Sequence, residues 1–449
     1  MYKRQVHDPS ILKADGEYYI FGSHMSAAKS SDLLNWEKVA DGYSKKNPVY
    51  GQIYDVADEA FAYSGSKNSL IKTDDKQVHV WAPDVIYNET TGLYYMYYCT
   101  TSTWNASNLC YGTSTTPEGP YEWQGALIYS GFNRKTISGT DVLDYVDEDY
   151  AYKNYIKGAQ YNYEDYPNAI DPTVFYDADG RMWMVYGSWS GGIFLLEIDK
   201  TTGLVIHPEA DKANNVDPYY GKRLLGGGHI SIEGPYIMYD ETSGYYYLFV
   251  SYGALTSNGG YQVRVFRSKT VDGEYVDMNG KYPEKSAQHQ NFGLKLTGNY
   301  KLPSLEKAYM ATGHNSAFVD DDGRMYLVYH TRFNDNGEGH SPRVHQMLVN
   351  EDGWPCELPY QTQGETVNKD GYDIDDIIGR YYVINQGTAI DSKIANPVIL
   401  YLEKNGKVKG EKSEGTWECK DGSYYMNITI DGKKYSGAVS YTHLRAHET

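Results

Sequence analysis

Cysteine, long apolar runs and positive charge are all scarce in this sequence. Four cysteines in 449 residues (Cys99, Cys110, Cys356 and Cys419) are too few for a disulfide framework, and the spacing leaves open whether Cys99 and Cys110 pair. No segment approaches the roughly 18 apolar residues that a membrane-spanning helix needs. Lys and Arg number 41 against 59 Asp and Glu, a net charge of -18, which argues against nucleic acid or an anionic membrane as a partner.

Aromatic residues, in contrast, are abundant. They make up 15% of the chain, and 48 of them are tyrosines. Aromatic and β-branched side chains favour half-buried pleated surfaces, so the composition predicts an all-β protein. The length exceeds what one hydrophobic core usually serves, so we expect one large domain and one small domain.

One sequence unit recurs five times. A polar or acidic residue precedes a short apolar strand, then a DG, TG or SG turn, then a strand rich in aromatics. The copies begin with HDPSI at 7–11, APDVI at 82–86, DPTVF at 171–175, EGPYI at 233–237 and HNSAF at 314–318. Tandem hairpins can also build a sandwich, but five copies that start alike favour radial repetition. We therefore predict a five-bladed β-propeller over residues 6–362.

Residues at the start of each copy are expected to converge. The first strand of each propeller blade lines the central channel, so Asp8, Asp171, Glu233 and His314 would meet there. Ala82 is the non-polar member of the ring. When the prolines are aligned, Glu233 lies one residue earlier than the others, so it should project differently.

Three carboxylates around one channel suit glycoside hydrolysis. That reaction needs an acid to protonate the leaving oxygen and a second carboxylate on the opposite face of the sugar. Crowded negative charges raise one another's pKa values and keep one group protonated near neutral pH.

The repeat motifs resemble those of glycoside hydrolase family 43. The likeness extends over about residues 6 to 360. It rests on His7-Asp8-Pro9, Trp81-Ala82-Pro83-Asp84, Asn168-Ala169-Ile170-Asp171-Pro172, Glu233-Gly234-Pro235 and Gly313-His314-Asn315-Ser316. The run GLKLTGNY at 293–300 further resembles the endo-α-1,5-L-arabinanases within this family.

The resemblance implies a role for each carboxylate. Asp8 would be the general base that activates water, Glu233 the general acid, and Asp171 the residue that raises the pKa of Glu233 and orients it. The family inverts anomeric configuration, which places base and acid about 6.5–9.5 Å apart. His314 would hold one calcium ion in the channel together with waters, an unusual set because calcium prefers oxygen ligands.

Substrate contacts also follow from the resemblance. Trp81 should lie at the channel rim and stack on a sugar, unless it packs between blades. The other positions that match family contacts are Gly112, Asn168, Ser188, Trp189 and Ser190. The partner would be arabinan or its oligosaccharides, and we expect a monomer with an extracellular or periplasmic location.

Three other functions compete with an inverting endo-arabinanase. An exo-acting α-L-arabinofuranosidase or β-xylosidase of the same family would have a blind pocket instead of an open cleft. A non-catalytic carbohydrate-binding propeller would lack one of the carboxylates, and none is missing. The related fructan-acting propellers retain configuration, and the signature at 168–171 argues against them.

Segments outside the repeat complete the expected organisation. Residues 43–79 and 131–167 are long for propeller loops, and we expect the second to form one wall of the substrate groove. Residues 366–440 are predicted to form a small all-β domain, a barrel or sandwich that is truncated. Residues 1–5 and 440–449 resemble cloning sequence, so the lack of a visible signal peptide says little about location.

Overall fold

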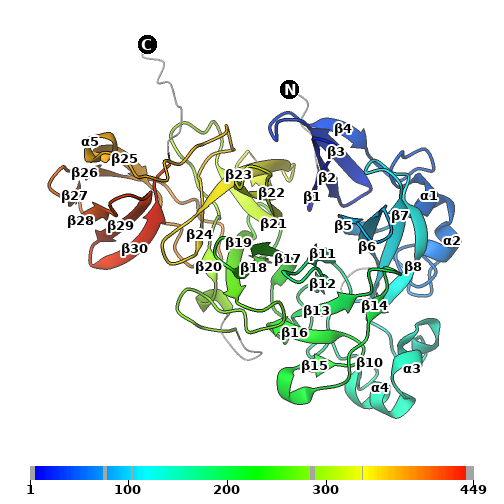
Figure 1. Ribbon diagram of the computed structural model, residues 1–449. Helices are drawn as coiled ribbons and strands as arrows, with labels where there is room; N and C mark the ends of the chain where they lie inside the picture. Colours follow the sequence, from blue (N-terminus) through cyan, green and yellow to red (C-terminus); the bar gives the residue numbers. More distant parts are fainter. Residues whose placement is uncertain (1–5, 74–77, 103–104, 284–288, 336, 441–449) are drawn as a thin grey trace.

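Five antiparallel sheets follow one another along the chain, and a sixth lies at its C-terminal end (Figure 1). The computed structural model describes residues 6–73, 78–102, 105–283, 289–335 and 337–440. The first, second, fourth and fifth sheets have four strands each, paired in sequence order, and the third has six, which are not all paired in sequence order. A further two-stranded sheet lies between the second and third sheets in the sequence. The predicted all-β class is confirmed. The stretches expected to be non-native, 1–5 and 440–449, lie outside the described residues except for Ser440.

The bounds of the strands follow the repeat. The first sheet contains β1 (Ser10–Ala14), β2 (Glu17–Gly22), β3 (Ser26–Ser30) and β4 (Glu37–Ala40). The second contains β5 (Val80–Asn88), β6 (Leu93–Thr101), β7 (Ser107–Ser114) and β8 (Glu122–Tyr129). The third contains β11 (Thr173–Tyr176), β12 (Met182–Tyr186), β13 (Ile193–Ile198), β14 (Val205–Ile206), β15 (Val216–Asp217) and β16 (Gly221–Leu225). The fourth contains β17 (Ile232–Asp240), β18 (Tyr245–Tyr252), β19 (Gln262–Ser268) and β20 (Leu294–Lys295), and the fifth contains β21 (Tyr309–Val319), β22 (Met325–Phe333), β23 (Ser341–Val349) and β24 (Pro355–Glu357).

The first strands of the five sheets form a closed ring. β1 contacts β5, β5 contacts β11, β11 contacts β17, β17 contacts β21, and β21 contacts β1 again. A separate hydrophobic cluster fills each of the five junctions between neighbouring sheets. The fifth and first sheets are also joined by hydrogen bonds, from Ser316 Oγ to the Pro9 carbonyl at 2.9 Å and from Tyr18 Oη to Asp320 at 2.6 Å. The sheets therefore pack radially around one centre.

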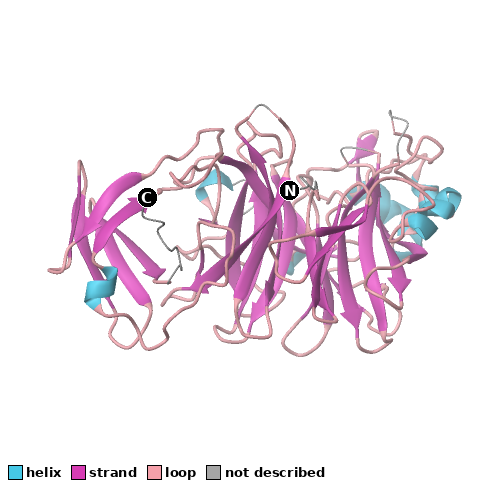
Figure 2. Ribbon diagram, turned by 90° about the horizontal axis from the view of Figure 1, so that it is seen from above, coloured by secondary structure: helices cyan, strands magenta, loops and turns pink. Residues whose placement is uncertain are grey.

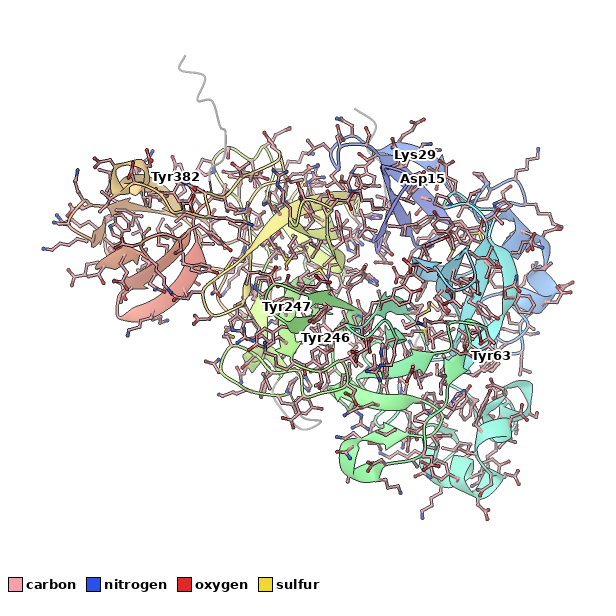
Figure 3. All side chains as sticks on the ribbon, viewed as in Figure 1. Asp15, Lys29, Tyr63, Tyr246, Tyr247 and Tyr382 are labelled. Atoms are coloured by element: carbon pink, nitrogen blue, oxygen red, sulfur yellow. The ribbon has the colours of Figure 1, made fainter. Side chains whose placement is uncertain are left out.

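Tyr246 and Tyr247 of β18 are adjacent, and their side chains pack into two different junctions between sheets (Figure 3). Successive side chains of a strand point to opposite faces of its sheet. Tyr246 Oη accepts a hydrogen bond from Ala178 N of the third sheet, whereas Tyr247 Oη donates to the Gly353 carbonyl of the fifth. Because these rings are large and keep a polar tip, each fills a junction and also satisfies a backbone group of the neighbouring sheet.

The turn chemistry of the first hairpin agrees with its sequence. Asp15 and Gly16 join β1 to β2 and have φ values of 53° and 80°. Two positive φ angles define the type I′ turn, which matches the twist of the flanking strands. Asp431 and Gly432 repeat the pattern at 49° and 78° in the last sheet.

The long segment 131–167 forms a compact insertion beside the second and third sheets. It contains the 3₁₀ helix η1 (Ile137–Gly139), α3 (Val142–Tyr145), α4 (Glu148–Asn154), β9 (Ile156–Lys157) and β10 (Gln160–Tyr161). Val142, Ala151 and Tyr155 are buried in the same cluster as the second and third sheets. Figure 1 shows α3 and α4 next to β10. Segment 43–79 contributes the short helices α1 (Gly51–Asp55) and α2 (Ala57–Ala60).

The C-terminal part is one open sheet beside the fifth sheet (Figure 2). Its strands pair in sequence order: β25 (Gly379–Val383), β26 (Val398–Leu402), β27 (Lys407–Gly410), β28 (Glu414–Cys419), β29 (Tyr425–Ile430) and β30 (Lys433–Ala438). In the described part of the chain no pairing joins β25 to β30, so this part is an open half barrel, where a truncated barrel or sandwich was predicted. Asn350 Nδ2 donates to the Ser436 carbonyl at 3.0 Å and ties β30 to the fifth sheet.

The structure can be compared with what the sequence indicated about membrane-spanning segments and about cysteine pairing. No helix among the described residues is long and apolar enough to cross a membrane. All four cysteines are free thiols, and Cys99 lies opposite Leu109 while Cys110 lies opposite Tyr98. The open question of a Cys99–Cys110 pair is therefore answered: the two cysteines occupy different rungs of the β6–β7 ladder.

Candidate functional site

The five repeat starts share an uncommon backbone conformation. Asp8, Ala82, Asp171, Gly234 and His314 have φ values of 54°, 38°, 56°, 56° and 48°. Four of these residues carry a side chain, which makes the left-handed region costly, by about 1–2 kcal/mol for each. Residues in such a conformation persist where the surrounding structure holds them, and they concentrate at functional sites.

The same angles explain the offset of Glu233. Gly234, not Glu233, occupies the ring position in the fourth sheet, and the β17–β18 register shifts between Glu233 and Tyr236. Such a β-bulge re-aims the neighbouring side chain. Glu233 therefore projects from a backbone position different from that of Asp8 and Asp171, as the proline alignment predicted.

Asp8 is the most heavily hydrogen-bonded of the predicted carboxylates. Its Oδ2 lies 2.6 Å from His7 Nδ1 and accepts from Ser23 Oγ at 2.5 Å, and its Oδ1 lies 3.2 Å from His314 Nδ1. Burial raises the pKa of Asp8, but the imidazoles of His314, His7 and His330 outweigh burial and hold that pKa well below its usual value. Asp8 is thus an ionised carboxylate at neutral pH, able to accept a proton.

Asp171 interacts electrostatically with both other carboxylates. Burial raises the pKa of Asp171 to about 7 against the opposing charge of His314, and the neighbouring charges of Glu233 and Asp8 add to the rise. Gly234 N donates to Asp171 Oδ2 at 3.2 Å, so Asp171 is bonded to the residue that follows Glu233. The Asp171 carboxyl therefore helps to fix the position of the segment that carries Glu233.

Glu233 is held at both carboxyl oxygens. Tyr261 Oη donates to Oε1 at 2.6 Å and Ser188 Oγ donates to Oε2 at 3.0 Å. The Glu233 side chain is half-buried, whereas Asp8 and Asp171 are buried. A fixed, partly exposed carboxyl is the arrangement that proton donation to a bound ligand requires.

His314 faces the same centre as the three carboxylates. Burial lowers its pKa, but Asp8, Asp171 and Glu233 reverse the effect and raise that pKa above the ordinary value. It helps to line a cavity in which Asp8, Asp84 and Asp171 also take part. This donor set of carboxylate oxygens and one imidazole fits a hard divalent cation with waters.

Another group also has the proximity of a metal site. Ligand atoms of His7, Asp8 and His330 lie within 4.8 Å of one another. The rings of His7 and His330, however, are stacked 4.7 Å apart at 11°, so their in-plane lone pairs run nearly parallel and do not converge. Hydrogen bonding to Asp8 accounts for this group without an ion.

The predicted substrate contacts lie in four places. Ser188, Trp189 and Ser190 follow β12, and Ser188 touches Glu233 directly. Trp81 is half-buried and packs against the core cluster of the second and third sheets, the alternative weighed for it. Asn168 is buried, with its Oδ1 3.4 Å from Ser130 Oγ. Gly112 pairs with Met96 and Trp123 inside the second sheet, so its contact with a ligand stays a prediction from resemblance.

The sequence analysis missed a second set of residues, at the end of the second strand of each repeat. Ser23 Oγ accepts from Ala82 N, Ser188 Oγ donates to Glu233, Ser251 Oγ accepts from His314 N, and His330 Nδ1 accepts from Asp8 N. In each case a side chain of one sheet bonds to the ring residue of the next sheet or, in the fourth sheet, to Glu233 beside it. A comparison of the repeats could have found them. The four residues stand at equivalent points, as the last residues of FGS, YGS, FVS and VYH. Tyr261 had no such marker.

A buried ionised carboxylate and a second carboxyl held by hydrogen bonds, in a ring of sheets, are the groups that hydrolysis by acid–base chemistry needs. The sequence model of glycosyl hydrolases family 43 matches residues 2–164 and 151–355, and that of a C-terminal lipocalin-like domain matches residues 359–449. The chain belongs to glycosyl hydrolases family 43.

Relatives in this family match nearly the whole chain. An extracellular endo-α-(1→5)-L-arabinanase from Thermotoga petrophila is 39% identical over 95% of this chain and 84% of its own length. Extracellular endo-α-(1→5)-L-arabinanase 2 from Bacillus subtilis is 37% identical over 96% of this chain and 86% of its own. The crystal structure of the Thermotoga petrophila endo-1,5-α-L-arabinanase in complex with TRIS superimposes with a TM-score of 0.83, at 38% identity, over 98% of this chain and 94% of that one.

Proposed function

We propose that this protein cleaves α-1,5-linked L-arabinan within the chain and inverts the configuration at the anomeric carbon. The observation that carries the proposal is the meeting of Asp8, Asp171 and Glu233, each with a different environment, at the centre of the five sheets. Relatives similar over most of this chain are endo-arabinanases. We propose further that the five sheets are the blades of a β-propeller over residues 6–362, with a separate C-terminal domain at 366–440.

The geometry suggests one displacement step. Asp8, ionised and anchored by His7 and Ser23, accepts a proton from the water that attacks the anomeric carbon. Glu233, oriented by Tyr261 and Ser188, gives its proton to the departing O5 of the next arabinose. Asp171 accepts a hydrogen bond from the Gly234 amide at 3.2 Å and so orients the segment that carries Glu233.

Substrate recognition is proposed for the residues around this centre. Trp189 and Ser190 follow Ser188 at the site, and Asn168, Trp81 and Gly112 are proposed as further contacts on resemblance. We propose that the enzyme acts as a monomer, outside the cell or in the periplasm, on arabinan or its oligosaccharides.

The product profile on debranched linear arabinan tests the function. We expect a ladder of arabino-oligosaccharides when products are separated by chain length, because internal cleavage leaves fragments of many sizes. Arabinose as the sole product would instead assign exo action. No release of either would contradict the proposed function.

A calcium ion held by His314 and waters is proposed in the central cavity. When bound, its charge would balance the carboxylates of Asp8, Asp84 and Asp171, which line the same cavity. We expect the His314→Ala variant to bind calcium at least ~10-fold more weakly in equilibrium dialysis, since it loses the protein ligand. The unchanged affinity of a His289→Ala variant, which alters a histidine of the η3 turn (His289–Asn291), serves as the control. Equal affinities of wild type and His314→Ala would refute this site.

A further inference from the structure

Three ring side chains from separate segments lead outward from the carboxylate site. Trp189 follows Ser188, which bonds to Glu233. The Trp189 ring lies 5.5 Å from the His229 ring, measured between centroids, and His229 lies 5.6 Å from Tyr163. Trp189 comes from the third repeat, His229 from the loop before β17, and Tyr163 from the insertion at 131–167. These three side chains are called the aromatic track below.

Backbone hydrogen bonds fix the three segments to one another. Gly228 N donates to the Glu164 carbonyl at 2.7 Å, Gly191 N to the Gly228 carbonyl at 2.9 Å, and Ile230 N to the Trp189 carbonyl at 3.1 Å. A Cβ at Gly191 would lie 2.3 Å from the Tyr166 backbone, so this close approach requires glycine. The aromatic track is therefore held on a preformed framework, which lowers the entropic cost of binding.

The outer members of the aromatic track are open to solvent. Tyr163 is 37% exposed, and His229 is exposed next to it. Ser190 Oγ, 3.5 Å from His229 Nδ1, adds a hydroxyl beside the rings. A surface tyrosine alone needs no function, and Tyr145 of the same insertion provides the comparison. It is 48% exposed, and its ring packs against the rings of His207 and Tyr219, at centroid distances of 3.6 Å and 5.9 Å, which are not part of the carboxylate site.

We propose that the aromatic track is an outer subsite that binds a furanose unit of the substrate beyond the bond being cleaved. Ring faces take up the C–H surfaces of sugars, while the imidazole, the phenol and the Ser190 hydroxyl exchange hydrogen bonds with sugar hydroxyls. Tyr163 makes the insertion at 131–167 a determinant of preference for long chains. This inference rests on the proposed function and adds two residues, Tyr163 and His229, to it.

Chain-length dependence tests the subsite. For Tyr163→Ala we expect kcat/KM on linear α-1,5-arabinohexaose to fall by about 10-fold, the loss of one aromatic contact, and kcat/KM on arabinotriose to change by less than about twofold. Tyr163→Phe keeps the ring and should retain most of the activity on arabinohexaose. His229→Ala should share the selective loss on the longer substrate.

Tyr145→Ala is the matched control, since it removes an exposed tyrosine of the same insertion away from the aromatic track. Its kcat/KM on arabinohexaose and on arabinotriose should equal that of wild type. Thermal unfolding is measured for each variant to check that it is folded. Equal losses on the two oligosaccharides, or no loss on arabinohexaose, would overturn the subsite even though wild type cleaves arabinan. A wild-type protein that releases no oligosaccharides would instead refute the proposed function, and the subsite with it.

Discussion

Replacing Asp8 by asparagine is expected to reduce kcat on linear arabinan by about 10³-fold or more. Asparagine keeps the shape and still accepts the hydrogen bond from Ser23, but it cannot take the proton of the attacking water. General base catalysis contributes roughly 10² to 10⁴ in rate, and water is a poor nucleophile without it. Reducing-sugar release under saturating substrate measures the effect, and it should be as large on an aryl arabinoside as on arabinan.

Added azide distinguishes a lost base from a lost fold. Azide needs no deprotonation, so it should restore turnover of Asp8→Asn on an aryl arabinoside and yield the inverted glycosyl azide. Asp277→Asn is the matched control, because Asp277 is also buried but bonds to Asn279 N and Lys281 N of its own turn, outside the cavity, and it should keep wild-type activity. A product with retained configuration, or full activity of Asp8→Asn, would remove Asp8 from the role of base.

The repeat made the fold predictable. Each copy combines a hairpin turn of the DG, TG or SG type with an aromatic-rich second strand that is buried over most of its length. Both signals are local, so all five sheets could be placed from sequence. The closure of the ring depends on contacts such as Ser316 with Pro9, whose partners are far apart in the chain. Local sequence patterns carry no information about such distant pairs. The only indication that the repeats meet was that all five copies begin in the same way.

The site was predictable in part for the same reason. Asp8, Asp171, Glu233 and His314 stand at equivalent points, so geometry followed from alignment. Ser23, Ser251 and His330 occupy another equivalent point and were detectable by the same comparison. Tyr261 is different: it lies outside the repeat motifs, in the NGGY turn before β19, and its bond to Glu233 arises from tertiary packing alone.

The C-terminal part shows a limit of local patterns. NG and DG turns predicted its hairpins correctly, as Asp431 and Gly432 show. Whether a sheet closes depends on strand tilt and on pairing between its first and last strands, which alternation does not encode. The exposed side chains of β25, including Tyr382 at 45%, are consistent with an open edge of the half barrel (Figure 3).

Replacing Glu233 by glutamine should produce a loss that depends on the leaving group. On linear arabinan, where a sugar alkoxide must depart, we expect kcat to fall by roughly 10² to 10⁴ because no proton is supplied. On an aryl arabinoside with an acidic phenol, departure needs no proton, so the variant should retain activity within about 10-fold of wild type. Initial rates on the two substrates, compared with Asp8→Asn, give the contrast.

The contrast separates proton donation from mere positioning. Tyr261→Phe removes the hydroxyl that holds Glu233 Oε1 but leaves the acid in place, so its loss on arabinan should be smaller than that of Glu233→Gln. Tyr261 and Glu233 lie at the same site. A general disturbance of that site would lower the activity on arabinan and on the aryl arabinoside equally, in both variants. Equal losses on arabinan and the aryl arabinoside for Glu233→Gln would therefore contradict the acid role, because only a missing proton distinguishes the two leaving groups.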